Sequence, residues 1–152
     1  MRWLVVLVAV AGCLGDSAPD YSSHWKFTAI VNAGIGDQAL DLSAGARMAS
    51  NPSGVQIDGD DYGSCDHSFS FVLPAPLTVQ TYDLRGPGTY VAYRDCRFGD
   101  MNIGAGSGSF TVHHADSTCA RPPCIDAEFQ FSSYVNPPQG FTAYFGGAVS
   151  NY

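Results

Sequence analysis

Charged residues are scarce in this sequence. Only 14% of the 152 residues are Asp, Glu, Lys or Arg, whereas an average soluble domain has about 25%. Lys26 is the only lysine, Glu128 is the only glutamate, and the formal net charge is -7. Because only seven residues are basic, the chain offers no basic surface for phosphate groups. The sequence therefore predicts no nucleic-acid partner.

Long hydrophobic runs and several chemical motifs are also missing. The run from Trp3 to Ala11 has nine residues, which as a helix would span about 13 Å, far less than the roughly 30 Å of a bilayer core. The sequence has neither the C-x-x-C pair of a zinc site nor the Gly-x-Ser-x-Gly turn of a serine hydrolase. Hydrophobic residues do make up 45% of the chain, beside 17 glycines and 9 prolines, and this composition excludes a disordered chain and a coiled coil.

The first residues have the layout of an export signal, with a basic start, an apolar run and then a polar stretch. Within them, Val10-Ala11-Gly12-Cys13 resembles the lipobox of bacterial lipoproteins. The resemblance implies a lipoprotein signal peptide over residues 1–12, lipidation of Cys13, and a polar tether over residues 13–23 before a single domain over residues 24–152.

The residue after this cysteine bears on the location of the protein. Bacterial lipoproteins with Asp there tend to stay in the inner membrane, so Leu14 implies an outer-membrane lipoprotein. The alternative is an ordinary secretory cut after Ala11, which would give a secreted or soluble periplasmic protein.

Five cysteines make an odd count for an exported protein. Acylation of Cys13 would leave four, which allow three pairings. Cys119 and Cys124 enclose two prolines, whose stiffness favours a turn that brings the two cysteines together. We therefore favour the pair Cys119–Cys124, with Cys65–Cys96 as the second. A zinc site is the disfavoured alternative.

From Trp25 onward, apolar residues recur with period two and are interrupted by Gly, Pro, Asn or Asp, which is typical of strands. The pattern predicts strands, with no long helix, at residues 25–31, 39–44, 54–57, 68–73, 77–84, 89–93, 109–114, 127–134 and 141–145. This spacing predicts an all-β fold, an antiparallel β-sandwich of jelly-roll or immunoglobulin-like type, with a flattened barrel as the alternative.

Several of these segments resemble a loose class of exported bacterial β-sandwich lipoproteins without assigned function. The likeness rests on the Trp-led first strand and on four later segments: 86–90 (GPGTY), 106–112 (GSGSFTV), 127–131 (AEFQF) and 141–147 (FTAYFGG). It implies the fold class and a place at the cell surface, and it implies no catalytic residue.

The densest charge cluster spans residues 58–66 and contains Asp58, Asp60, Asp61 and Asp66. Compared with a calcium-binding loop, Asp58, Asp60 and Asp66 fall at ligand positions, but Phe69 stands where a bidentate Glu is needed. The three aspartates are therefore candidate calcium ligands, and calcium is the one cofactor that the sequence suggests. The alternative is a solvated hairpin turn, where Asp and Gly are favoured.

The segment His113-His114-Ala115-Asp116-Ser117 contains the residue types of a hydrolytic triad. Neighbouring strand residues point to opposite faces, so we expect one histidine packed inward, the other in solvent, and no shared site. His24 and His67 look isolated in the sequence. The sequence predicts no catalytic residue and no enzyme activity.

Tyrosines on strands are the candidate binding residues, because a flat ring with a polar tip suits sugar rings or a protein contact. Tyr90, Tyr93 and Arg94 form one such group; the alternative is tyrosines that merely line the sandwich edges. We therefore expect a lipid-anchored, extracytoplasmic, non-catalytic module that binds a glycan or an envelope protein or serves as an envelope component. The alternatives are a small enzyme of jelly-roll or lipocalin-like type, or a calcium-dependent carbohydrate-binding module.

Overall fold

The computed structural model describes residues 24–34, 36–52, 54–63, 67–96, 106–119, 124–135 and 140–151. The expected signal peptide, Cys13 and the tether lie outside these ranges, as do Cys65 and Asp66. In the part of the chain that is described, no helix has the length and apolar composition needed to cross a membrane.

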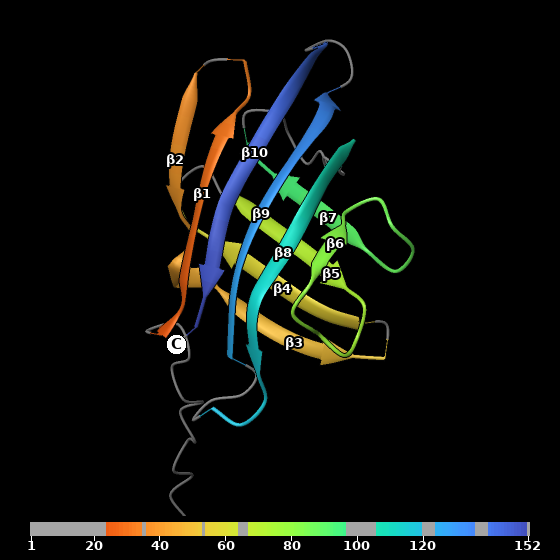
Figure 1. The fold of residues 1–152 in the computed structure, drawn as a ribbon. Helices are drawn as coiled ribbons and strands as arrows, with labels where there is room; N and C mark the ends of the chain where they lie inside the picture. The colour runs from red at the N-terminus through yellow and green to blue at the C-terminus, as the bar shows by residue number, and fades with distance from the viewer. Residues whose placement is uncertain are drawn as a thin grey trace, which may run out of the picture.

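Within the described residues, ten strands form two antiparallel sheets, so the predicted β-sandwich is confirmed. The strands are β1 (Lys26–Asn32), β2 (Asp37–Asp41), β3 (Arg47–Asn51), β4 (Gly54–Asp60), β5 (Ser68–Leu73), β6 (Thr81–Asp83), β7 (Tyr90–Arg94), β8 (Ser107–Asp116), β9 (Cys124–Val135) and β10 (Phe141–Ser150). The first sheet has the order β2-β1-β10-β9-β8-β6, and the second has the order β3-β4-β5-β7. Figure 1 shows the six-stranded sheet in front, with the strands of the four-stranded sheet crossing behind it.

The alternation of apolar and polar residues explains which face each strand buries. In β9, Ala127, Phe129 and Phe131 point into the core, while Glu128 and Gln130 are exposed. The same period-two pattern occurs in β1, β4 and β5. Each sheet therefore presents one apolar face to the other sheet and one polar face to solvent.

Several sequence predictions differ from the observed strands. The strand expected over residues 39–44 ends at Asp41, because Ser43–Gly45 form a 3-10 helix, and the strand expected over residues 141–145 continues to Ser150. β3 was not expected, because its sequence RMASN carries little apolar alternation; this edge strand is held by pairing to β4 alone. The strand expected over residues 77–84 is reduced to β6. Tyr82 explains part of this, since its hydroxyl accepts a hydrogen bond from the backbone N–H of Thr78 at 2.9 Å and thereby holds the preceding segment in a turn.

Aromatic rings from both sheets fill the centre of the sandwich. Phe69 and Phe71 from β5 meet Phe129 from β9 with ring centroids 5.4 and 4.8 Å apart. Phe27 from β1 packs on the same ring at 5.9 Å. These four rings are at most 3% exposed. The phenylalanines that alternate along the sequence thus join the two sheets.

The predicted disulfide between Cys119 and Cys124 is confirmed. It closes the connection between β8 and β9, and its Cα atoms are 6.1 Å apart, within the usual range for a disulfide. Cys96 is also disulfide-bonded. Its expected partner Cys65 lies outside the described residues, so the pairing Cys65–Cys96 stays a prediction.

Candidate functional site

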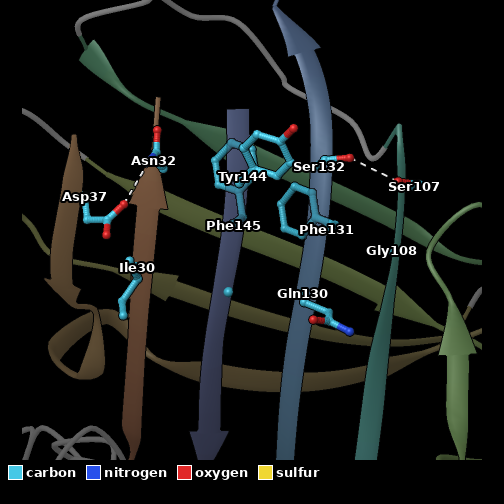
Figure 2. A pocket seen from close by; sticks show the side chains of 11 residues that line it. Ile30, Asn32, Asp37, Ser107, Gly108, Gln130, Phe131, Ser132, Tyr144 and Phe145 are labelled. Carbon is cyan, nitrogen blue, oxygen red and sulfur yellow. Dashed lines mark hydrogen bonds between the residues drawn. The ribbon is translucent and has the colours of Figure 1, made fainter. Parts of the chain in front are cut away.

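A groove of about 600 Å³ lies on the outer face of the six-stranded sheet. This volume is within the roughly 300 to 1,000 Å³ typical of small-molecule sites. Figure 2 shows it from close by. It is lined by Ile30, Asn32, Asp37, Ser107, Gly108, Gln130, Phe131, Ser132, Tyr144, Phe145 and Gly146.

One side of the groove is a row of five side chains that strand register places next to one another. Asp37 lies opposite Asn32, Asn32 opposite Tyr144, Tyr144 opposite Ser132, and Ser132 opposite Ser107. The Asn32 amide donates a hydrogen bond to the Asp37 carboxylate at 2.8 Å, and the hydroxyls of Ser107 and Ser132 are 3.0 Å apart (Figure 2). Tyr144 thus stands between two hydrogen-bonded pairs.

The next row contains the hollow itself. Ile30 lies opposite Gly146, and Gly146 lies opposite Gln130. A Cβ atom added to Gly146 would come no closer than 3.7 Å to its nearest neighbour, the carbonyl oxygen of Phe129, which is an ordinary van der Waals distance. The backbone therefore does not require glycine here, and the missing side chain leaves open space between Ile30 and Gln130.

The adjacent residue, Gly147, faces the core and has a different role. A Cβ atom there would lie 2.6 Å from the Phe129 ring and would also overlap the carbonyl oxygen of Thr28. Gly147 is therefore required by packing. The two successive glycines of β10 open opposite faces of the sheet, one to Phe129 and the other to solvent.

The groove has exposed apolar surface and little charge. Tyr144 is 61% exposed and Ile30 is 56% exposed. Tyr134, also on the outer face of β9, is 58% exposed and lies opposite Thr142, one row beyond the groove. Asp37 is the one charged side chain among the described residues that line the groove.

The structure places the binding residues expected from the sequence on two opposite faces of one strand. All three lie on β7, at the edge of the four-stranded sheet. Tyr90 and Arg94 are exposed, whereas Tyr93 is fully buried and donates a hydrogen bond to Asp95 at 2.8 Å. Tyr93 is therefore a core residue and takes no part in an exposed surface.

The two described calcium candidates have protein partners. Asp58 accepts hydrogen bonds from Arg47, Gln56 and Ser70 at 2.7 to 3.0 Å. Asp60 accepts one from the backbone N–H of Tyr62 at 2.7 Å. The third candidate, Asp66, is not among the described residues. Within those residues, no three His, Cys, Asp or Glu side chains are grouped to hold a metal ion.

The adjacent histidines of β8 differ from the sequence expectation of one inward and one outward ring. The register between β8 and β9 shifts between Val112 and His114, so a β-bulge interrupts the alternation there. Both His113 and His114 are exposed as a result. His113 lies 3.5 Å from Glu128 on the neighbouring strand, an exposed contact that contributes little to stability.

His67 is a site residue that no sequence motif singles out. It is 6% exposed. Its Nδ1 lies 2.6 Å from the Asp61 carboxylate, and its Nε2 lies 3.8 Å from the Asp95 carboxylate and 3.4 Å from the Gln38 amide nitrogen. Because β4, β5 and β7 are antiparallel neighbours, Asp61, His67 and Asp95 meet at one end of the four-stranded sheet.

This group, called the His67 network below (Gln38, Asp61, His67, Tyr93 and Asp95), has His67, Tyr93 and Asp95 buried and Gln38 and Asp61 partly buried. It joins the two sheets, since Gln38 lies on β2. A hydrolytic triad would place a nucleophile at the second ring nitrogen of the histidine. Here that nitrogen faces an amide and a second carboxylate. The arrangement suits a polar link inside the fold.

Because of the His67 network, we expect the folded protein to lose stability in acid. Partial burial by itself would raise the pKa of Asp61, but hydrogen bonds from the Gly63 backbone and from the His67 ring and backbone outweigh it and hold this pKa below its usual range. A lowered folded-state pKa stabilises the fold above the unfolded value of about 3.9, and this stabilisation is lost as the pH falls through the folded-state pKa.

We therefore expect Asp61→Asn to be less stable than the wild type at pH 7 and to lose less further stability on acidification from pH 5 to pH 2. Urea denaturation of the variant and the wild type across this pH range measures both free energies of unfolding. Asp126→Asn, at an exposed position of β9, controls for the change in net charge. An equal acid sensitivity of Asp61→Asn and the wild type would contradict the expectation.

Comparison of the chain with protein-family models, with curated proteins and with solved structures finds no match in any of the three. Function is therefore inferred from the groove and its chemistry.

Proposed function

We propose that this protein is a non-catalytic, extracytoplasmic binding module whose ligand occupies the groove over Gly146. One observation carries the proposal: an outward-facing strand position in the middle of a six-stranded sheet has no side chain, although neither backbone nor packing demands a glycine there. The hollow is bordered by the exposed apolar surfaces of Tyr144 and Ile30. Exposed apolar surface beside hydrogen-bonding side chains is typical of a binding site.

The composition of the groove supports binding over catalysis. Acid–base and nucleophilic mechanisms use a His, Cys, Lys or acidic side chain, or a Ser, Thr or Tyr hydroxyl that an adjacent base activates. Among the described residues that line the groove, Asp37 is the one acidic or basic group. Its carboxylate already accepts a hydrogen bond from Asn32.

Filling the hollow is the direct test. We expect Gly146→Leu to abolish ligand binding, because the new side chain projects into the groove, and to leave folding intact, because its Cβ has room. Ala148→Leu is the matched control, since Ala148 is the next outward, exposed residue of β10. Amide chemical shifts of both variants and the wild type are compared during titration with a fragment library of saccharides, peptides and short acyl chains.

The expected shifts cluster around Gly146, Tyr144 and Gln130, disappear in Gly146→Leu and persist in Ala148→Leu. Shifts that cluster on β7 around Tyr90 and Arg94, or shifts that survive Gly146→Leu, would overturn the proposal. The proposal would also be overturned if no fragment of the library shifted any amide signal of the wild type.

We further propose that the module is a lipid-anchored component of the cell envelope, attached through Cys13. The disulfide Cys119–Cys124 supports export, because such bonds persist in oxidising compartments. The intact mass of the protein from the membrane fraction should show an acylated chain that begins at residue 13. An unmodified chain that still carries residues 1–12 would contradict both the anchor and the export step.

A further inference from the structure

We infer that the ligand of the groove is an uncharged oligosaccharide that lies across the strands of the six-stranded sheet. This inference depends on the proposed function and adds the chemical class and the orientation of the ligand.

The two rows of the groove present the two kinds of contact that a sugar ring needs. A pyranose ring has an apolar C–H face and a rim of hydroxyl groups. Tyr144 offers a flat, exposed apolar ring next to the hollow at Gly146. Around it, Asn32, Gln130 and Ser132 offer amide and hydroxyl groups that both donate and accept hydrogen bonds.

The row from Asp37 to Ser107 sets the orientation and the size of the ligand. It crosses five neighbouring strands, β2, β1, β10, β9 and β8. Four strand spacings of about 4.8 Å give a length of roughly 19 Å. Such a length suits several linked rings, and the central position of Tyr144 places one ring over the middle of the row.

The charge of the groove excludes an acidic sugar chain. Asp37 is the one charged lining residue among those described, and the whole chain has a net charge of -7. An anionic polymer would meet repulsion and find no cation to offset it.

Two other classes of ligand fit the groove less well. An acyl chain would cover the Gln130 amide without offering it a partner, which is costly, and would leave unused the remaining hydrogen-bonding capacity of Asn32 and Ser132 beside their bonds to Asp37 and Ser107. An extended peptide satisfies its backbone by pairing with a strand edge. Here the groove lies over β10, whose two edges already pair with β1 and β9.

Affinity electrophoresis in native gels tests the inference on the full chain. The gels contain hydroxyethyl cellulose, galactomannan, dextran or starch as uncharged polysaccharides, alginate as a polyanion, or chitosan as a polycation. We expect retardation by at least one uncharged polysaccharide and none by alginate. Gly146→Leu and Tyr144→Ala should each weaken the retardation at least tenfold, while Ala148→Leu and Tyr90→Ala, the matched exposed positions, should retain it.

Failure of this inference and failure of the proposed function would give different results. Retardation by alginate or chitosan alone that is lost in Gly146→Leu would overturn the uncharged class and keep the groove as the binding site. No retardation in any gel, with peptide or acyl fragments still shifting the amides around Gly146, would overturn the oligosaccharide and keep the proposed function. Retardation by an uncharged polysaccharide that survives Gly146→Leu would overturn both.

Discussion

Phe69→Ala is expected to destabilise the protein by about 3 to 5 kcal/mol, the typical cost of removing a buried phenylalanine ring. Phe69 is 1% exposed. It lies within 4.7 to 6.2 Å, between ring centroids, of six other aromatic rings: Phe27, Phe71, Tyr93, Phe129, Phe131 and Phe145. These rings come from both sheets, so the cavity would open at the centre of the sandwich and could not easily collapse.

Chemical denaturation of the wild type and the variant measures this effect. Tyr144→Ala removes an aromatic ring of similar size from an exposed position and should change the free energy of unfolding by less than about 0.5 kcal/mol. Phe69→Leu keeps part of the side-chain volume, so its loss in free energy of unfolding should lie between those of Phe69→Ala and Tyr144→Ala. A loss below about 1 kcal/mol for Phe69→Ala would show that the aromatic cluster does not hold the sheets together.

Asp95→Ala is expected to have the next largest effect, a loss of roughly 3 kcal/mol, because breaking a buried polar network leaves its remaining members poorly paired. Asp95 is 1% exposed. Its carboxylate accepts the Tyr93 hydroxyl hydrogen bond at 2.8 Å and lies 3.8 Å from Nε2 of His67. The substitution therefore removes a buried hydrogen-bond acceptor from the His67 network.

A double-mutant cycle separates this effect from a general loss of packing. Tyr93→Phe keeps the buried ring and removes only the hydroxyl. If the two residues interact as described, the double variant Tyr93→Phe/Asp95→Ala should be less destabilised than the sum of the single variants by more than about 0.5 kcal/mol. Strict additivity in urea denaturation would argue against the hydrogen bond as a source of stability.

The His67 network and the groove should affect different properties of the protein, stability in one case and binding in the other. The His67 network joins β2 of one sheet to the end of the other, so its variants should lower stability and leave the chemistry of the groove unchanged. The groove depends on exposed side chains and on a missing one, so its variants should change binding and leave stability nearly unchanged. Measuring both properties on the same variants distinguishes a structural cluster from a binding site.

The sequence by itself determined the fold class and much of the strand layout. Alternation in β5 and β9 predicted which residues face the core, because a strand turns every second side chain to the same face. The two prolines between Cys119 and Cys124 correctly favoured that disulfide. β3 was not predicted, because its strand state depends on pairing with β4 and on no pattern of its own.

Only the tertiary structure decided where polar residues meet. His67 lies 29 residues from Gln38 and six from Asp61, and no spacing in the sequence signals that strand pairing brings them together. Gly146 and Gly147 are adjacent and identical in the sequence. Gly147 is required by its packing against Phe129. Gly146 lies on the opposite face of β10 and forms the floor of the groove. Local periodicity determines which way a side chain points, whereas its neighbours depend on the register and packing of distant strands.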